Sequence, residues 1–239
     1  MRLRPLPGSL LRPLAPAILF AAVALRAFSA AGPEPLPFPT DISAEAPAVA
    51  VTLATTETLN QSIGGYPPRL RDAQHRQEIY ARWRSALADA RALHARDGDT
   101  ETALLLLGRL YRQGHNLDVR QSAEEAIQLF ERALTAHPDS DALNLEASYF
   151  YLSINPTFAP QGEAALLKLR RLRGTDRDLS IERGFVFAYL YQDRIEDAKR
   201  QIDRCLTFAP DDKMLLLFRD SLKGKSQIEK ISGPPPPSK

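Results

Sequence analysis

The sequence predicts an all-α fold, a short solenoid of helix pairs, and three observations support this. Eleven of the 19 prolines lie in residues 1–70 and four lie in 234–237, so only four interrupt the region between them. Because proline breaks helices, this middle region is free to be helical. Apolar residues recur there every three or four positions, which is the helical period. The arrangement of small and large residues also repeats along the chain, which is typical of stacked helix pairs.

The helical period predicts eight helices, and several of them follow recognisable start signals. The segment 97–100 (Asp-Gly-Asp-Thr) precedes the second helix, and Asp211-Asp212 precede the last. Ser122 with Glu125 three positions later is a capping-box pattern for the third. The predicted helices lie near residues 74–97, 100–113, 121–136, 140–154, 161–173, 178–191, 194–208 and 211–223.

Residues 1–31 predict an export leader. They combine four arginines with no acidic residue, an apolar run over 13–25 and small residues at 29–31, which is typical of a secretory signal peptide. The expected location is therefore periplasmic or secreted. Two alternatives stay open: a mitochondrial presequence, and an uncleaved membrane anchor formed by residues 13–31, although the run is shorter than the roughly 20 residues that a spanning helix needs.

Proline content sets the other boundaries. Residues 32–71 are predicted to be a disordered proline-rich linker, and residues 225–239 a disordered proline-rich tail. The helical repeat domain is expected between them, at 72–224.

Three segments repeat one spacing of small, large and turn-forming residues. The second helices of the first and third copies have the same spacing of four, three and five residues. Small residues let two helices approach, large residues fill the space between them, and proline ends the second helix. The first copy carries Leu107, Gly108, Tyr111, Gly114, Ala126, Phe130, Ala133 and Pro138. The middle copy carries Tyr151 and Ala165, and the third carries Tyr189, Ala198, Cys205 and Pro210.

These residues resemble the tetratricopeptide repeat (TPR) in a divergent form. The first copy, with Leu107-Gly108, Gly114 and a longer loop after it, also has some character of the related Sel1-like repeat. The resemblance implies a right-handed α-solenoid of about three TPR-like helix pairs, with an extra N-terminal helix and a C-terminal capping helix. It implies a protein or peptide partner and no cofactor.

In TPR proteins the first helix of each pair lines a concave groove, and this resemblance identifies the candidate groove residues. They are Arg109, Arg112, Gln113, Tyr149, Arg183, Phe187 and Tyr191. Arginine and aromatic side chains are typical of binding hot spots. The alternative is that the aromatic members pack against the capping helix of the array itself. The family's clamp for a terminal carboxylate is not expected, because Leu105, Arg109 and Glu146 occupy its positions.

No residue pattern predicts catalysis or a metal site. The nucleophile elbow, zinc-protease and phosphate-loop motifs do not occur in the sequence, so the protein is not expected to be an enzyme. A formal charge of +2 and the lack of aromatics in the basic run 168–177 argue against nucleic acid as partner. Cys205 is expected to be a buried structural thiol.

The sequence thus predicts an exported, non-catalytic scaffold or adaptor. The alternative is a structural envelope subunit that an uncleaved N-terminal anchor tethers to the membrane. The oligomeric state stays open.

Overall fold

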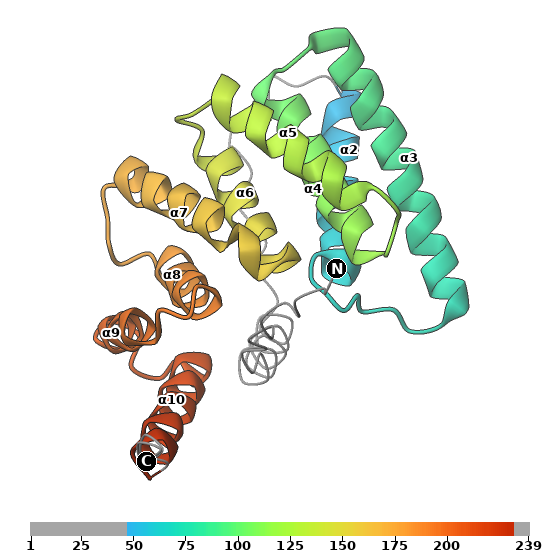
Figure 1. Cartoon of the computed structure of the whole chain (residues 1–239). Helices are drawn as coiled ribbons and strands as arrows, with labels where there is room; N and C mark the ends of the chain where they lie inside the picture. The colour runs from blue at the N-terminus through green and yellow to red at the C-terminus, as the bar shows by residue number, and fades with distance from the viewer. Residues whose placement is uncertain (1–46, 232–239) are drawn as a thin grey trace, which may run out of the picture.

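The computed structural model describes residues 47–231, with side chains over 48–223. Every regular element within this range is helical, which confirms the all-α prediction. Figure 1 shows the helices following one another in an arc, from α3 at the right to α10 at the lower left. In chain order they are α2 (Pro47–Ile63), α3 (Ala73–Asp97), α4 (Glu101–Asn116), α5 (Ser122–Ala136), α6 (Asp141–Ile154), the 3-10 turn η2 (Pro156–Phe158), α7 (Ala159–Arg173), α8 (Leu179–Tyr191), α9 (Ile195–Leu206) and α10 (Lys213–Ile231).

All eight predicted helices are present, and each begins within two residues of its predicted start. Aspartates cap three of them: the Asp72 carboxylate accepts from the His75 amide at 2.7 Å, Asp178 accepts from the Ser180 amide at 3.0 Å, and Asp212 accepts from the Leu215 amide at 3.0 Å. The predicted capping box is wrong, because Ser122 is already the first residue of α5 and its side chain is buried. Close packing against the neighbouring helix, and not capping, therefore occupies this serine.

Helix α2 lies within the segment that the sequence predicted to be a disordered linker, and that prediction is wrong for residues 47–63. Pro47 occupies the first helical position, where proline is tolerated. No proline follows until Pro67. The buried positions of α2 recur at three and four residues, as in any amphipathic helix, and they are Val49, Thr52, Leu53, Thr56, Leu59 and Ile63.

The helices pair in chain order. Helix α2 packs on α3, α4 on α5, α6 on α7 and α8 on α9. The first helix of each pair also contacts the first helix of the next, and each second helix contacts the first helix that follows it. The described residues thus form a TPR-like solenoid of four pairs. The helix predicted as an extra N-terminal element is α3, and it forms a pair with α2. Helix α2 covers part of the apolar face of α3.

Two glycines of the repeat pattern allow close helix contacts. A Cβ atom on Gly108 would lie 2.6 Å from the Phe130 ring of α5, and one on Gly114 would lie 2.6 Å from both Ser122 and Trp83. Their neighbours in the repeat pattern are buried as well: Leu107, Tyr111, Ala126, Ala133, Tyr151, Ala165, Ala198 and Cys205. Tyr189 is half-buried, and Pro138 and Pro210 follow the ends of α5 and α9.

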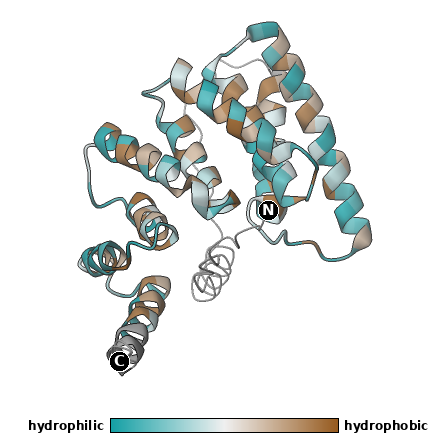
Figure 2. Cartoon of the chain, in the orientation of Figure 1, coloured by the Kyte–Doolittle hydropathy of each residue, from teal (hydrophilic) through white to brown (hydrophobic). Residues whose placement is uncertain are grey.

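The array ends on α10, which packs on α9. Leu215, Phe218 and Leu222 face inward, while Leu217 is 55% exposed. The helix continues to Ile231, so the predicted disordered tail is wrong for residues 225–231, which lack proline and contain good helix formers. At the opposite end α3 is hydrophilic over most of its visible length (Figure 2), as the terminal element of a repeat array needs to be.

The predicted leader, residues 1–31, lies outside the described residues. Among the helices of residues 47–231, none combines the length and the apolar character that crossing a membrane requires.

Candidate partner-binding site

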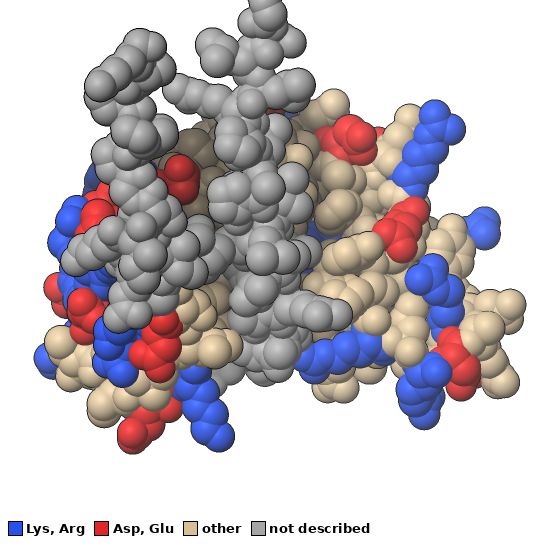
Figure 3. All heavy atoms as spheres, turned by 60° about the horizontal axis from the view of Figure 1, so that its bottom comes forward, with Lys and Arg blue, Asp and Glu red and all other residues tan. Residues whose placement is uncertain are grey.

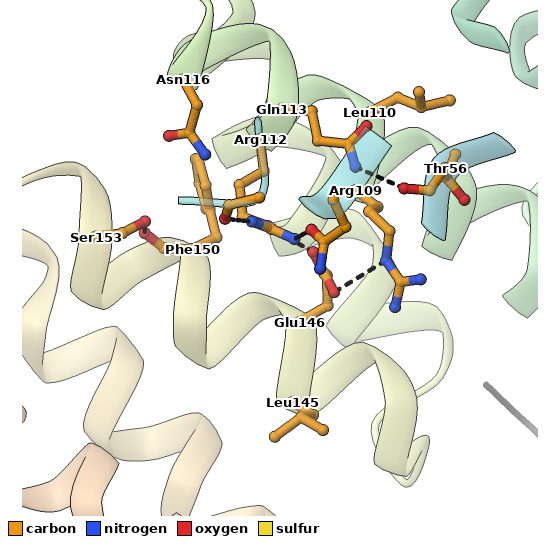
Figure 4. A network of polar contacts seen from close by, with 12 residues as sticks. Thr56, Arg109, Leu110, Arg112, Gln113, Asn116, Leu145, Glu146, Phe150 and Ser153 are labelled. Carbon is orange, nitrogen blue, oxygen red and sulfur yellow. Dashed lines mark hydrogen bonds and ion pairs between the residues drawn. The ribbon is translucent and has the colours of Figure 1, made fainter. Parts of the chain in front are cut away.

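The groove residues predicted on α4 lie together, but helix α2 covers them. Arg109, Arg112 and Gln113 are 2%, 4% and 0% exposed. With Asn116, also buried, they occupy one side of α4, because residues three, four and seven positions apart share a helix face. We call these four residues the donor face (Figure 4). In this structure they bind α2, so they are not an open groove surface.

The donor face holds the C-terminal end of α2 through hydrogen bonds. Asn116 Nδ2 donates to the Ile63 carbonyl at 2.9 Å, and Gln113 Nε2 donates to the Thr56 carbonyl at 3.0 Å. Arg112 donates to the Gly64 carbonyl and, at 3.1 Å, to the Asn60 side chain. The last carbonyls of a helix have no partner within the helix, and these contacts supply partners for the carbonyls of Ile63, the last residue of α2, and of Gly64, which follows it.

Glu146 of α6 fixes both arginines from the other side. Its carboxylate accepts from Arg112 Nε at 2.6 Å and from Arg109 Nε at 3.2 Å, and it is fully buried. Arg109 Nη1 also pairs with Glu57 of α2 at 2.6 Å. The network therefore joins α2, α4 and α6, the first helices of three successive pairs.

Electrostatics keep Glu146 ionised. Burial alone raises the pKa of a carboxyl group, but the positive charges of Arg112 and Arg109 and the hydrogen bonds from both outweigh it. The pKa of Glu146 consequently lies below its ordinary value. The site thus holds a buried ionic network in which the Glu146 carboxylate is negatively charged.

The groove residues predicted on α6 and α8 are placed differently. Tyr149 and Tyr191 are half-buried, and burial raises the pKa of both, that of Tyr191 to about 12. Arg183 is also half-buried and pairs with Asp212, the residue before α10. Its Nε atom is buried, and no described residue accepts a hydrogen bond from it.

Phe187 supports the alternative that the sequence left open. It is 2% exposed and makes an edge-to-face contact with Phe218 of α10, with ring centroids 5.6 Å apart. It therefore packs inside the array against the capping helix. Phe187 also contacts Tyr191 at 6.4 Å, which fixes that tyrosine at the edge of the same cluster.

The basic run after residue 167 is largely paired within the chain. Arg170 binds buried Glu182 through two nitrogens at 2.8 and 2.7 Å, and Arg173 binds Asp141 through two at 2.7 Å. Figure 3 shows a face of the molecule on which basic side chains lie beside acidic ones. Charge neutralised by neighbours gives little attraction for an anionic partner.

Sequence reasoning missed Asn116, Glu57 and Asn60 as members of the network. A signal was present for Asn116: it continues the polar spacing of Arg109, Arg112 and Gln113 on a helix whose residues 103–107 are all apolar. The two residues of α2 carried no such signal, because they lie about fifty positions away in a segment predicted to be disordered. Among the described residues, no cluster of three or more His, Cys, Asp or Glu side chains converges as a metal site would require.

Comparison with known proteins gives one fold likeness. No protein-family model and no curated protein matches the sequence. Among solved structures the chain is similar to a thermophilic TPR protein of Thermus thermophilus, at 19% identity and a TM-score of 0.48, over 88% of this chain and 96% of that one.

Proposed function

We propose that the protein is a non-catalytic adaptor that binds a protein or peptide segment along the first helices α6 and α8. A TPR-like array presents these helices side by side, and the contact between α6 and α8 places Tyr149 and Arg183 on neighbouring elements. Arginine and tyrosine at the centre of a surface are typical of binding hot spots.

One observation carries the proposal: the guanidinium of Arg183 is only partly satisfied. Asp212 binds one end of it, while the buried Nε has no acceptor among the described residues. A buried donor without an acceptor costs free energy. The Arg183 side chain as a whole is 34% exposed, so a partner carbonyl or carboxylate would bind its exposed part, and half-buried Tyr149 and Tyr191 would supply apolar contact area on α6 and α8.

The test is affinity capture with the variant Tyr149→Ala/Arg183→Ala/Tyr191→Ala. Its control is Arg171→Ala/Leu172→Ala, which changes two exposed residues on the second helix α7. We expect wild type and control to capture the same partner and the triple variant to lose it, with far-UV circular dichroism unchanged. If the folded triple variant captures that partner as well as wild type does, the proposed surface is wrong.

Site-specific crosslinking locates the contact independently. A photoreactive residue at Ser153 on α6, which is half-buried, is expected to crosslink the partner, and one at Leu167 on α7 is not. Crosslinking from Leu167 alone would place the partner on the second helices and contradict the proposal.

We also propose that the protein is exported, on the composition of residues 1–31. N-terminal sequencing of the protein purified from its own cells tests this directly. A mature start near residue 30 or 32 supports export with cleavage, while a start at Met1 in a membrane fraction favours an uncleaved anchor.

A further inference from the structure

All the hydrogen bonds described between α2 and the donor face run in one direction. Each donor is on α4 and each acceptor is on α2 or on Gly64, which directly follows it. Three of the acceptors are backbone carbonyls, those of Thr56, Ile63 and Gly64. The carbonyls of Ile63 and Gly64 lie at the C-terminal end of α2, and every helix presents such carbonyls at its end, so this part of the donor face recognises a helix end and not a particular sequence. The negative end of the helix dipole is its C-terminus, and Arg112 complements it.

The donor face carries more positive than negative charge. Arg109 and Arg112 share one carboxylate on the α6 side, that of Glu146. A helix that covers and desolvates the donor face must therefore bring an acidic side chain to balance the second arginine. Glu57 of α2, seven residues before Gly64, supplies the balancing charge.

Helix α2 satisfies this site incompletely. Gln113 is 0% exposed, so water does not reach its Oε1 atom. No described residue donates a hydrogen bond to that atom either. The Glu57 side chain remains 27% exposed. A helix with a donor side chain opposite Gln113 would make one hydrogen bond that α2 lacks.

We infer that the donor face is a binding site for the C-terminal end of a helix, that α2 occupies it within the chain, and that a partner helix displaces α2. The partner helix carries an acidic residue two turns before its end and a Ser, Thr or Asn side chain that donates to Gln113. This inference rests on the proposed adaptor function and extends its surface from α6 and α8 to α4.

The first test measures displacement in the wild-type chain. An unlabelled, amidated peptide of residues 47–66 is added to the ¹⁵N-labelled full chain, and amide hydrogen exchange is followed by NMR. Residues 65 and 66 keep the Gly64 carbonyl as a peptide group, and the terminal amide removes the negative charge that a free carboxylate would add. We expect the peptide to accelerate exchange of labelled amides in α2 and to leave those of α4 protected, because the peptide replaces α2. If α2 exchange does not change at saturating peptide, α2 is a fixed structural helix and the inference is wrong.

The second test weakens the internal occupant without touching the site. Glu57→Ala removes the ion pair to Arg109, and its control Gln61→Ala changes an exposed residue of the same helix. We expect Glu57→Ala to bind the added peptide about tenfold more tightly than wild type and Gln61→Ala to match wild type. Equal affinities in all three chains would overturn the inference.

Two peptides give the specificity of the site. A peptide with Glu57→Lys is expected to bind at least about tenfold more weakly, and Asn116→Ala in the chain is expected to weaken the unmodified peptide. Equal binding of both peptides would show that apolar contact alone drives association. These measurements use purified chain and peptide only. If the peptide does not displace α2, the proposed partner surface around Tyr149 and Arg183 can still be correct. If affinity capture does not depend on Tyr149 and Arg183, the peptide can still displace α2.

Discussion

Glu146 is buried between Arg109 and Arg112, and its charge contributes to stability. We expect Glu146→Gln to lower the free energy of unfolding at neutral pH by about 3 kcal/mol, because it removes the carboxylate that pairs with Arg112 and one of the two that pair with Arg109. The folded-state pKa lies below the ordinary 4.5. The contribution is therefore complete above pH 4.5 and is lost as the pH falls through the folded-state pKa.

Urea titrations between about pH 6 and about pH 3 measure this. Wild type should lose more stability over that range than Glu146→Gln, while Glu125→Gln, an exposed control on α5, should follow wild type. Parallel curves for wild type and Glu146→Gln would show that Glu146 is not linked to folding.

Cys205 should be unreactive while the protein is folded. It is 0% exposed, and burial raises the pKa of its thiol to about 11. At pH 8 its thiolate fraction is then about a hundredfold lower than that of an ordinary thiol, and the thiolate is the nucleophile. We expect a thiol reagent to modify the native chain at least about a hundredfold more slowly than the urea-unfolded chain. Equal rates would mean that α9 opens readily.

At the scale of elements, the sequence predicted the helices of residues 73–206 well, because apolar residues recur at the helical period through them and the prolines lie between helices or near their ends. It did not predict α2. Prolines on both sides suggested a linker, and Thr52 and Thr56 at two inward positions weakened the apolar pattern. The groove residues predicted on α4 share one face, as their spacing requires, but α2 covers that face. Their burial was not predictable, since the sequence indicates disorder for the helix that covers them and its contacts span about fifty residues.

The contact between α4 and α5 requires a glycine. We expect Gly108→Ala to destabilise the protein by about 1–3 kcal/mol, because the new Cβ would lie 2.6 Å from the Phe130 ring, which is itself fully buried. Gly65→Ala is the matched control, since a Cβ there meets nothing within 4 Å. Thermal unfolding followed by circular dichroism compares the two variants. A Gly108→Ala protein as stable as the control would mean that α5 shifts without cost.

On the scale of the whole molecule, ion pairs join the successive helix pairs. Arg173 at the end of α7 binds Asp141 at the start of α6 and Asp178 before α8. Its hydrogen bonds to Asp141, and then to Asp178, raise the pKa of Arg173 above its already high ordinary value. Glu182 of α8 similarly receives Arg170 from α7 and Gln201 from α9. These contacts connect the half of the array that contains α2 to α7 with the half that contains α8 to α10.

Arg173→Ala should therefore uncouple the two halves. We expect a loss of about 1–2 kcal/mol, since hydrogen bonds between charged groups are lost at a site that is partly exposed to solvent. In a repeat array, stability is a sum of unit and interface terms, so a weak interface lets one half unfold first.

Trp83, the single tryptophan, reports on α3, and Cys205 reports on α9. In wild type and in the exposed control Arg171→Ala, tryptophan fluorescence and thiol labelling should give the same urea midpoint. In Arg173→Ala the thiol of Cys205 should become accessible at lower urea than the fluorescence change of Trp83, because the pairs beyond α7 lose a contact to the rest. Coincident midpoints in Arg173→Ala would mean that apolar contacts between α6, α7 and α8 couple the halves without this arginine.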